Sequence, residues 1–313
     1  MITPFFSVVI PAYKANYLKE AVDSILNQTY NDYEIVIVND ASPYNIKTIV
    51  GLYNDNRIRY FENKENCGAI NVVDNWNICL SYVKGKYVIC MGDDDKLLPT
   101  CLMEYAKLMA KYPNLGVYHA WTELIDEESD FYSLQQPRPE FESALSLAWN
   151  RWNGRNKQYI GDFCFNVDLL RKDGGFYKTP LAWGSDTITA IRAAMHGGIA
   201  NTQVLCFQYR VNRYTISNSG HNDIKIEALM ENEKWFTGFI KKQEQNISLS
   251  SLDKKYLKCI KDELPKYFKR MYISGIQADL KNHRKAILKW IKKANQYDIS
   301  MGELLICWIK SLR

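Results

Sequence analysis

Phe6-Ser7-Val8-Val9-Ile10 opens the regular pattern of this chain, and Pro11 ends the run. Its residues are mostly apolar and β-branched, which is typical of a strand buried inside a sheet. Apolar residues then recur at helical spacing between 18 and 26. A second apolar run, Glu34-Ile35-Val36-Ile37-Val38, predicts a second buried strand. The chain is therefore expected to begin as strand, helix, strand.

The alternation continues along the first 120 or so residues. Stripes at helical spacing predict helices over 72–83 and 100–111, and short apolar or alternating runs predict strands over 57–61, 87–91 and 116–119. Strands separated by helices of this length pair in parallel through right-handed crossovers. We therefore predict an α/β fold with a mostly parallel sheet flanked by helices.

The pattern is lost from about 121 to 159, where aromatic residues and a Pro-containing stretch replace the periodicity. We interpret this part as a long excursion over one face of the sheet. Regular structure is expected to return with a strand at Phe163-Cys164-Phe165, a helix over 186–196 and a strand over 203–209.

Polar residues follow three of the predicted strands, as Pro11-Ala12-Tyr13, Asn39-Asp40 and Asp93-Asp94-Asp95. In parallel sheets ligands bind at the carboxyl ends of the strands, so we expect these residues to share a site. Three adjacent carboxylates repel one another, and a hard divalent cation bound with substrate phosphates relieves the repulsion. Taken singly, a solvated acidic turn and an aspartate that caps a helix remain the alternatives.

The composition is that of a folded protein, because 47% of the 313 residues are hydrophobic and 24% are charged. No run approaches the roughly 18 apolar residues of a membrane-spanning helix. The first residues lack the basic and apolar regions of a signal peptide. The eight cysteines include no pair two residues apart, which gives no zinc-site spacing. We therefore predict a cytoplasmic protein whose reduced cysteines are packed in its core.

The net charge of +5 is unevenly distributed. Residues 225–313 contain 19 Lys and Arg against 10 Asp and Glu, whereas the preceding part contains 21 against 25. The composition changes near the same point to Lys-rich amphipathic helices with few Gly or Pro. We therefore predict one α/β domain over 1–223 and a basic helical region over 224–313.

The basic region contains apolar stripes at helical spacing. Ile287, Trp290, Ile291 and Ala294 share one face, and Leu304-Leu305-Ile306-Cys307-Trp308-Ile309 is a short apolar run. Packing against the first domain or a second copy is the favoured interpretation, and contact with an anionic membrane surface is the alternative. We expect no nucleic-acid binding, since aromatic–basic interleaving and a helix-turn-helix signature are both missing.

Several segments resemble the motifs of glycosyltransferase family 2, whose members have the nucleotide-sugar-binding fold called GT-A. The segments are Ser7–Tyr13, Leu26-Asn27-Gln28-Thr29-Tyr30, Ile35–Ser42, Asn66-Cys67-Gly68 with Asn71, Met91–Pro99, Gly174-Gly175-Phe176 and Tyr209-Arg210. They occur in the order of the family's motifs and span about residues 5 to 215. The resemblance therefore implies a GT-A fold, followed here by a C-terminal helical extension.

The resemblance also implies how a nucleotide would be held. Pro11 and Tyr13 are expected to border the nucleobase, and Asp40 to bind its imide edge, which favours uridine. Asn71 belongs to a segment that resembles the family's Asn-x-Gly motif, and we include it among the nucleotide-binding residues. Asp93 is expected to meet the ribose or the metal.

The metal-binding motif of the family corresponds to the acidic triplet. Asp94 and Asp95 are expected to bind Mn²⁺ or Mg²⁺, which would neutralise charge on the leaving diphosphate. The family often has Asp-x-Asp here, and alignment on Pro99 puts its first aspartate at Gly92. The division of roles among the three aspartates is therefore left open.

The general base of the family lies in an acidic pair that opens a helix. Asp186 matches this position, with Ser185 where Glu is common, and a helix cap is the alternative. Trp183 is a candidate for stacking on a sugar, although ordinary packing is favoured. Arg210 is a candidate diphosphate contact with a salt bridge as the alternative. His221 is a candidate for the metal or donor, although a plain surface role is favoured.

The resemblance implies a metal-dependent, inverting glycosyltransferase that moves a sugar from a UDP-sugar to a hydroxyl of a glycan or lipid-linked saccharide. Cell-surface polysaccharide synthesis is the expected setting, in the cytoplasm or at the inner face of the membrane, and the basic helices would supply a peripheral membrane contact or a homo-oligomer interface. The alternative is a non-catalytic nucleotide-sugar-binding subunit of a glycan assembly complex, which the departures at Gly92 and Ser185 favour.

Overall fold

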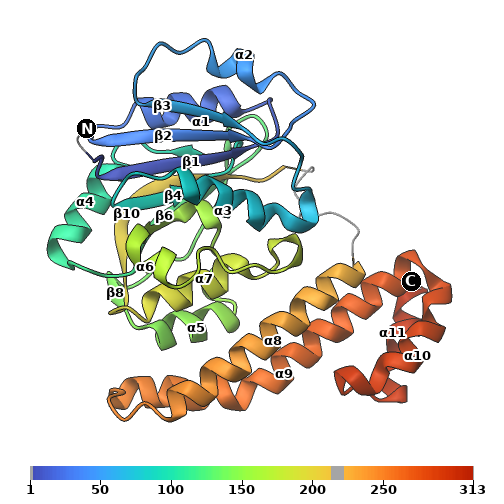
Figure 1. Ribbon diagram of the computed structural model, residues 1–313. Helices are drawn as coiled ribbons and strands as arrows, with labels where there is room; N and C mark the ends of the chain where they lie inside the picture. The colour runs from blue at the N-terminus through green and yellow to red at the C-terminus, as the bar shows by residue number, and fades with distance from the viewer. Residues whose placement is uncertain (1–2, 213–221, 313) are drawn as a thin grey trace. The chain divides into compact units, whose positions relative to one another are not determined.

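The computed structural model describes residues 3–212 and 222–312 of the chain. These fall into two compact units, one formed by residues 3–178 and 185–212 and the other by residues 179–184 and 222–312. Figure 1 shows an α/β arrangement in the first unit and only helices in the second. Each unit is described by itself below.

The described residues of the first unit form a ten-stranded sheet in the order β3-β2-β1-β4-β9-β6-β10-β5, with β7 beside β6 and β8 beside β10. The strands are β1 (Phe6–Ala12), β2 (Tyr33–Asn39), β3 (Ile58–Glu62), β4 (Tyr87–Cys90), β5 (Lys96–Leu97), β6 (Val117–Ile125), β7 (Phe131–Leu134), β8 (Phe141–Glu142), β9 (Phe163–Asn166) and β10 (Ile199–Arg210). The long pairs β1–β2, β2–β3 and β6–β10 are parallel, and β9 joins β4 and β6 as an antiparallel strand. The predicted α/β architecture is confirmed.

The centre of the sheet is almost wholly apolar. All seven residues of β2 and all but Pro11 of β1 are buried, as expected for parallel strands covered on both faces. Pro11 lies inside β1 opposite Val38, where the sequence predicted that it would end the strand. Pairing with β4 reaches only to Val9, so Pro11 borders β2 alone and its missing N–H costs little.

Helices cover the sheet because their apolar residues recur on one side. They are α1 (Leu18–Leu26), α2 (Ile46–Val50), α3 (Val72–Tyr82), α4 (Cys101–Lys111), α5 (Ala144–Trp152), α6 (Val167–Lys172) and α7 (Ser185–Ala194), with the 3₁₀ turns η1 (Ala69–Asn71) and η2 (Ile160–Asp162). In α1 the residues Leu18, Ala21, Val22 and Ile25 are all fully buried, which is the stripe seen in the sequence. Six of the eight cysteines are buried and all are free thiols, as predicted.

The segment 121–159 is more regular than the sequence indicated. Strand β6 continues to Ile125, β7 and β8 add short antiparallel edges, and α5 begins at Ala144, where the Ser143 side chain accepts a hydrogen bond from the Ser146 N–H. The residues of β7 are largely exposed, so they lack the apolar alternation that marks a half-buried strand. The expected structureless excursion is therefore wrong.

The second unit consists of the 3₁₀ turn η3 (Pro180–Ala182) and a group of helices: α8 (Asn222–Glu244), α9 (Ser251–Asn282), η5 (Arg284–Ala286), α10 (Ile287–Lys293), η6 (Ala294–Tyr297) and α11 (Met301–Ser311). The long helices α8 and α9 lie side by side (Figure 1), joined by Phe236 against Phe268 and by a 2.6 Å hydrogen bond from Tyr272 to Glu233. Neither these helices nor any other in the described ranges is long and apolar enough to cross a membrane.

Candidate active site

The site lies at the carboxyl ends of β1, β2 and β4, where the sequence placed it. Ala12 at the end of β1 pairs with Asn39 at the end of β2, and the Asp40 N–H donates to the Ala12 carbonyl at 2.9 Å. β4 ends at Cys90, and the N–H of the next residue, Met91, donates a hydrogen bond to the Val9 carbonyl of β1. Parallel pairing thus brings the three polar clusters to one edge.

Asp40 is buried and held by the loop that follows β3. Its carboxylate accepts hydrogen bonds from the Asn63 amide at 2.8 Å, the Cys67 N–H at 3.0 Å and the Asn66 amide at 3.2 Å. Burial raises the pKa of the Cys67 thiol to about 11, and the nearby charge of Asp40 adds to the rise. The loop therefore fixes the orientation of the carboxylate that we expect to face a nucleobase.

The remaining residues expected around the nucleobase are more open. The Tyr13 side chain is 43% exposed, Pro11 is half-buried, and Asn71 at the end of η1 is exposed. The Tyr13 carbonyl accepts a 2.6 Å hydrogen bond from Ser42, which ties the ends of β1 and β2 together. Tyr13 is thus exposed, and its backbone is fixed next to the end of β2.

Asp93 and Asp95 point into the protein. One Asp93 oxygen accepts from the backbone N–H groups of Tyr13 at 2.7 Å and Lys14 at 2.6 Å, while Asp95 accepts from the Arg210 N–H at 3.0 Å. Burial, followed by the charge of Asp94, raises the pKa of Asp93 to about 6 and also raises the pKa of Asp95. The triplet therefore concentrates negative charge that the protein itself only partly balances.

Asp94 is the most accessible of the three, with 14% of its side chain exposed. Its Oδ2 lies 3.0 Å from the Lys14 ammonium and 2.7 Å from the Asn212 amide. Burial acts to lower the pKa of Lys14, but the carboxylates of Asp94 and Asp93 raise it by more. Lys14 is therefore a fixed counter-ion for the triplet.

The position where the family often has an aspartate lies close to two carboxylates. A Cβ built on Gly92 would lie 2.7 Å from an Asp95 oxygen and 3.0 Å from an Asp94 oxygen. A side chain at this position would therefore require the Asp95 carboxylate to shift. The packing of the triplet thus favours glycine where the family often has aspartate.

Arg210 lies beneath the triplet, with its side chain completely buried. The guanidinium donates to the carbonyls of Asp94 at 2.8 Å and Asp126 at 3.0 Å, and to the Glu20 carboxylate at 2.9 Å. It also lies 4.0 Å from the centre of the Tyr17 ring. The salt bridge that the sequence left open is present, and the contact with diphosphate stays a prediction.

Asp186 stands in the first turn of α7, where the sequence placed the general base. Burial raises its pKa, and the positive charge of Arg151 counteracts part of the rise. The neighbouring Ser185 is fully buried, so a Glu at that position would carry its charge into the interior.

A pair of stacked tyrosines lies next to the triplet. The rings of Tyr159 and Tyr209 lie 3.5 Å apart and nearly parallel. Burial raises the pKa of Tyr209, and the charge of Asp95 adds to the rise. Tyr209 directly precedes Arg210, whose backbone N–H donates to Asp95, so the stack adjoins the acidic triplet.

Trp183 belongs to the second unit, and His221 lies outside the described residues. The Trp183 ring has the Lys225 ammonium 5.1 Å from its centre, and its carbonyl accepts a 2.8 Å hydrogen bond from Asn232. These contacts agree with the favoured interpretation of ordinary packing, and a stacking role stays a prediction.

The sequence did not reveal Lys14, Asn212 or Tyr159 as members of the site. Lys14 directly follows the segment Pro11-Ala12-Tyr13, and this adjacency was a usable signal. Asn212 and Tyr159 reach the site only through the pairing of β10 with β6 and the turn η2. Neither has a local sequence signature.

The family of the chain follows from comparisons with known proteins. The model of the family described as Glycosyl transferase family 2 matches residues 7–172. A glycosyltransferase of Rickettsia typhi is 25% identical over 291 residues, covering 91% of this chain and 87% of that protein. The chondroitin synthase of Pasteurella multocida is 40% identical over 111 residues, covering 33% of this chain and 11% of the synthase.

Two solved structures have a similar fold. TarS 1-349 of S. aureus in complex with UDP-GlcNAc gives a TM-score of 0.62 at 15% identity, covering 98% of this chain and 79% of that one. The mannosyltransferase PcManGT of Pyrobaculum calidifontis, in complex with GDP-Man and Mn²⁺, gives a TM-score of 0.53 at 20% identity. The match covers 99% of this chain and 88% of that one. Because the family model spans more than half of the chain and the fold agrees, this protein belongs to glycosyltransferase family 2, has the GT-A fold and is a glycosyltransferase.

Proposed function

We propose that this glycosyltransferase moves a sugar from a UDP-sugar, with inversion, to a hydroxyl of a glycan or lipid-linked saccharide in cell-surface polysaccharide synthesis. The observation that carries the proposal is that Asp40 and the acidic triplet follow the carboxyl ends of β2 and β4, the two strands that flank β1. We propose that the diphosphate binds near the triplet and the acceptor near Asp186, on opposite sides of one sugar, as inversion requires.

For the donor, we propose that Asp40, Pro11, Tyr13, Asn71 and Asp93 hold the nucleotide. The rigid support of Asp40 by Asn63, Asn66 and Cys67 suits a carboxylate that must present one oxygen to a base edge. The exposed Tyr13 ring offers a face for the base. TarS in complex with UDP-GlcNAc supports a uridine donor, while PcManGT with GDP-Man makes the guanosine donor the comparison to test.

The acidic triplet fits a divalent cation that is shared with the donor. Among residues 3–212 and 222–312 no three His, Cys, Asp or Glu side chains are grouped as a complete ligand set. Mg²⁺ commonly takes only one or two carboxylates and completes its shell with phosphates and water. We propose that Asp94 and Asp95 hold Mn²⁺ or Mg²⁺, which when bound would neutralise charge on the leaving diphosphate.

We propose Asp186 as the general base that takes the proton from the acceptor hydroxyl. A carboxylate with a raised pKa accepts a proton more readily than an exposed aspartate does. The ionised form is the active one, so the rate should rise with pH through this raised pKa. The stacked Tyr159 and Tyr209 would exclude water from the adjacent side.

We propose that residues 1–223 form the catalytic domain and 224–313 a basic helical region. Trp183, Arg210 and His221 stay candidates for substrate contacts.

The experiment is a calorimetric panel of UDP-, GDP- and dTDP-sugars, with and without Mn²⁺, followed by transfer assays on saccharide acceptors. We expect UDP-sugars to bind most tightly and Mn²⁺ to strengthen binding. Binding of GDP-sugars alone would contradict the role of Asp40, and binding of a donor without transfer to any acceptor would favour the non-catalytic alternative.

The base is tested by Asp186→Asn against Asp168→Asn, an exposed aspartate in the first turn of α6. We expect Asp186→Asn to lower kcat by about 10²–10⁴-fold with little change in donor affinity. Asp168→Asn should leave both unchanged. Wild-type turnover by Asp186→Asn would eliminate it as the base.

A further inference from the structure

The helices α10 and α11 have one side packed against their own unit. Trp290 is buried and donates a 2.8 Å hydrogen bond from its indole to Asp279 of α9. In α11 the buried residues are Leu304, Cys307 and Ser311, and the Cys307 thiol lies 3.8 Å from the Ile273 carbonyl of α9. This inward stripe packs against α9 of the same unit, whereas the sequence favoured packing against the first domain or a second copy.

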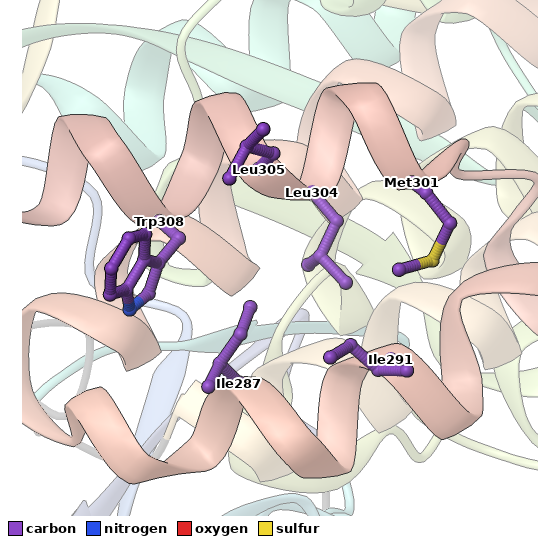
Figure 2. Close-up of a pocket in the computed structure, with 6 residues that line it drawn as sticks. All are labelled: Ile287, Ile291, Met301, Leu304, Leu305 and Trp308. Atoms are coloured by element: carbon purple, nitrogen blue, oxygen red, sulfur yellow. The ribbon is translucent and has the colours of Figure 1, made fainter.

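The outward side of α11 is also apolar. Leu305, Ile306 and Ile309 are 54%, 53% and 47% exposed, and Leu288 of α10 is 68% exposed. Between the two helices lies a hollow of about 240 Å³, and Figure 2 shows the side chains of α11 facing those of α10 across it. The hollow is lined by Ile287, Ile291, Met301, Leu304, Leu305 and Trp308. A contiguous apolar surface of this kind on a monomer marks an interaction site.

Basic side chains lie on the same helices and on the turn η5 before them. Arg284, Lys285, Lys292, Lys293 and Lys310 are exposed and have no ion pair among the described residues. The two acidic residues in the same stretch, Asp298 and Glu303, lie 3.7 Å and 3.2 Å from the Lys269 ammonium. Residues 284–312 contain six Lys and Arg against two Asp and Glu, so the charge of this stretch is mainly positive.

The charge decides between the two occupants that an apolar face could have. A two-fold contact between copies would place the same basic residues of both chains close together, which costs electrostatic free energy. An anionic lipid surface attracts these residues while its acyl region accepts Leu305, Ile306 and Ile309. Exposed apolar side chains together with basic residues are typical of an amphipathic surface that lies in the membrane interface, and here two short helices share that surface.

We propose that α10 and α11 form a docking surface for an anionic phospholipid bilayer, with Ile306 and Ile309 entering the interface and Lys292 and Lys293 contacting headgroups. The proposal concerns binding alone and does not depend on the identity of donor or acceptor. It would hold the enzyme at a surface where lipid-linked saccharides are found.

The test is flotation of the full chain with phosphatidylcholine vesicles, either pure or containing about 30% phosphatidylglycerol, at low and high salt. We expect binding only to the anionic vesicles and weaker binding at high salt, because exposed charges are screened. Binding that is equal on both vesicles, or absent from both, would overturn the proposal.

Two double variants locate the surface. Ile306→Ser/Ile309→Ser and Lys292→Glu/Lys293→Glu should each lower the vesicle partition coefficient at least about tenfold. The matched controls Ile247→Ser/Leu252→Ser and Lys254→Glu/Lys255→Glu change exposed residues of the same unit and should bind as the wild type does.

A second copy is the occupant to exclude. Sedimentation velocity without lipid should give the same monomer for the wild type and for Ile306→Ser/Ile309→Ser. If the wild type is a dimer and this variant is a monomer, the partner of the surface is a second copy of the chain and the bilayer proposal is overturned. Unchanged partition of both surface variants would show that the binding surface lies elsewhere.

Discussion

Replacing Arg210 by Met should unfold the first unit more easily, because Arg210 organises the floor of the site. Its side chain is wholly buried and donates to the carbonyls of Asp94, Asp126 and Glu127 as well as to Ser129 and Glu20. Met fills a similar volume but supplies none of these donors. The free energy of unfolding should therefore fall, because these acceptors lose their hydrogen-bond donor.

The size of the loss follows from which acceptors can reach water. Glu20 is 46% exposed and can be hydrated again, so its ion pair contributes little. The carbonyls of Asp94 and Asp126 lose a charged donor in a partly buried setting, at about 1–3 kcal/mol each. With the lost stacking on Tyr17 we expect a total of about 3–5 kcal/mol.

The assay is denaturant unfolding followed by tryptophan fluorescence, without nucleotide or metal. Arg57→Met is the matched control, since Arg57 makes a paired contact with Asp55 but both side chains are partly exposed. The control should cost about 1 kcal/mol or less. If Arg210→Met costs no more than the control while the affinity for the nucleotide falls, the guanidinium serves the diphosphate directly and the structural reasoning is refuted.

Two further predictions concern single groups. Lys14→Gln should raise the affinity for Mn²⁺ about fivefold, since Lys14 competes with a cation for Asp94 and a partly exposed ion pair is worth about 1 kcal/mol. Electron paramagnetic resonance of free Mn²⁺ measures this affinity. An unchanged affinity, when the wild type does bind Mn²⁺, would contradict the prediction. Burial and the charge of Arg138 lower the pKa of His119 to about 4, so the unfolded chain takes up this proton between pH 6.5 and 4 and the folded chain does not. The wild type should therefore lose about 3 kcal/mol more stability than His119→Asn on going from pH 7 to 4, and parallel curves in denaturant titrations at both pH values would count against this assignment.

The strands and the edge that carries the site could be predicted from the sequence alone. The runs in β1 and β2 are apolar at nearly every position because both faces of these strands are covered. Parallel pairing of β1 with β2 and with β4 then places Asp40 and the triplet at the same edge of the sheet. Local composition was sufficient because each of these strands is wholly buried.

The strands that lie at the edge could not be predicted in the same way. β7 has mostly exposed residues, and it exists because its backbone pairs with β6. Such a strand depends on hydrogen bonds to a distant partner, which leave no periodic signal in its own side chains. For this reason the segment 121–159 was misjudged.

The roles within the site were decided by tertiary structure. Lys14 has no motif of its own and Arg210 belongs to a segment that resembles a family motif, yet only the fold directs one to the Asp94 carboxylate and the other to the Asp94 carbonyl. The carboxylates of Asp94 and Asp95 lie close to Gly92 and disfavour a side chain there. The sequence alone determined which residue types meet at the sheet edge. Which carboxylate is partly exposed and which is buried depends on contacts between residues up to 118 positions apart, and only the folded chain contains them.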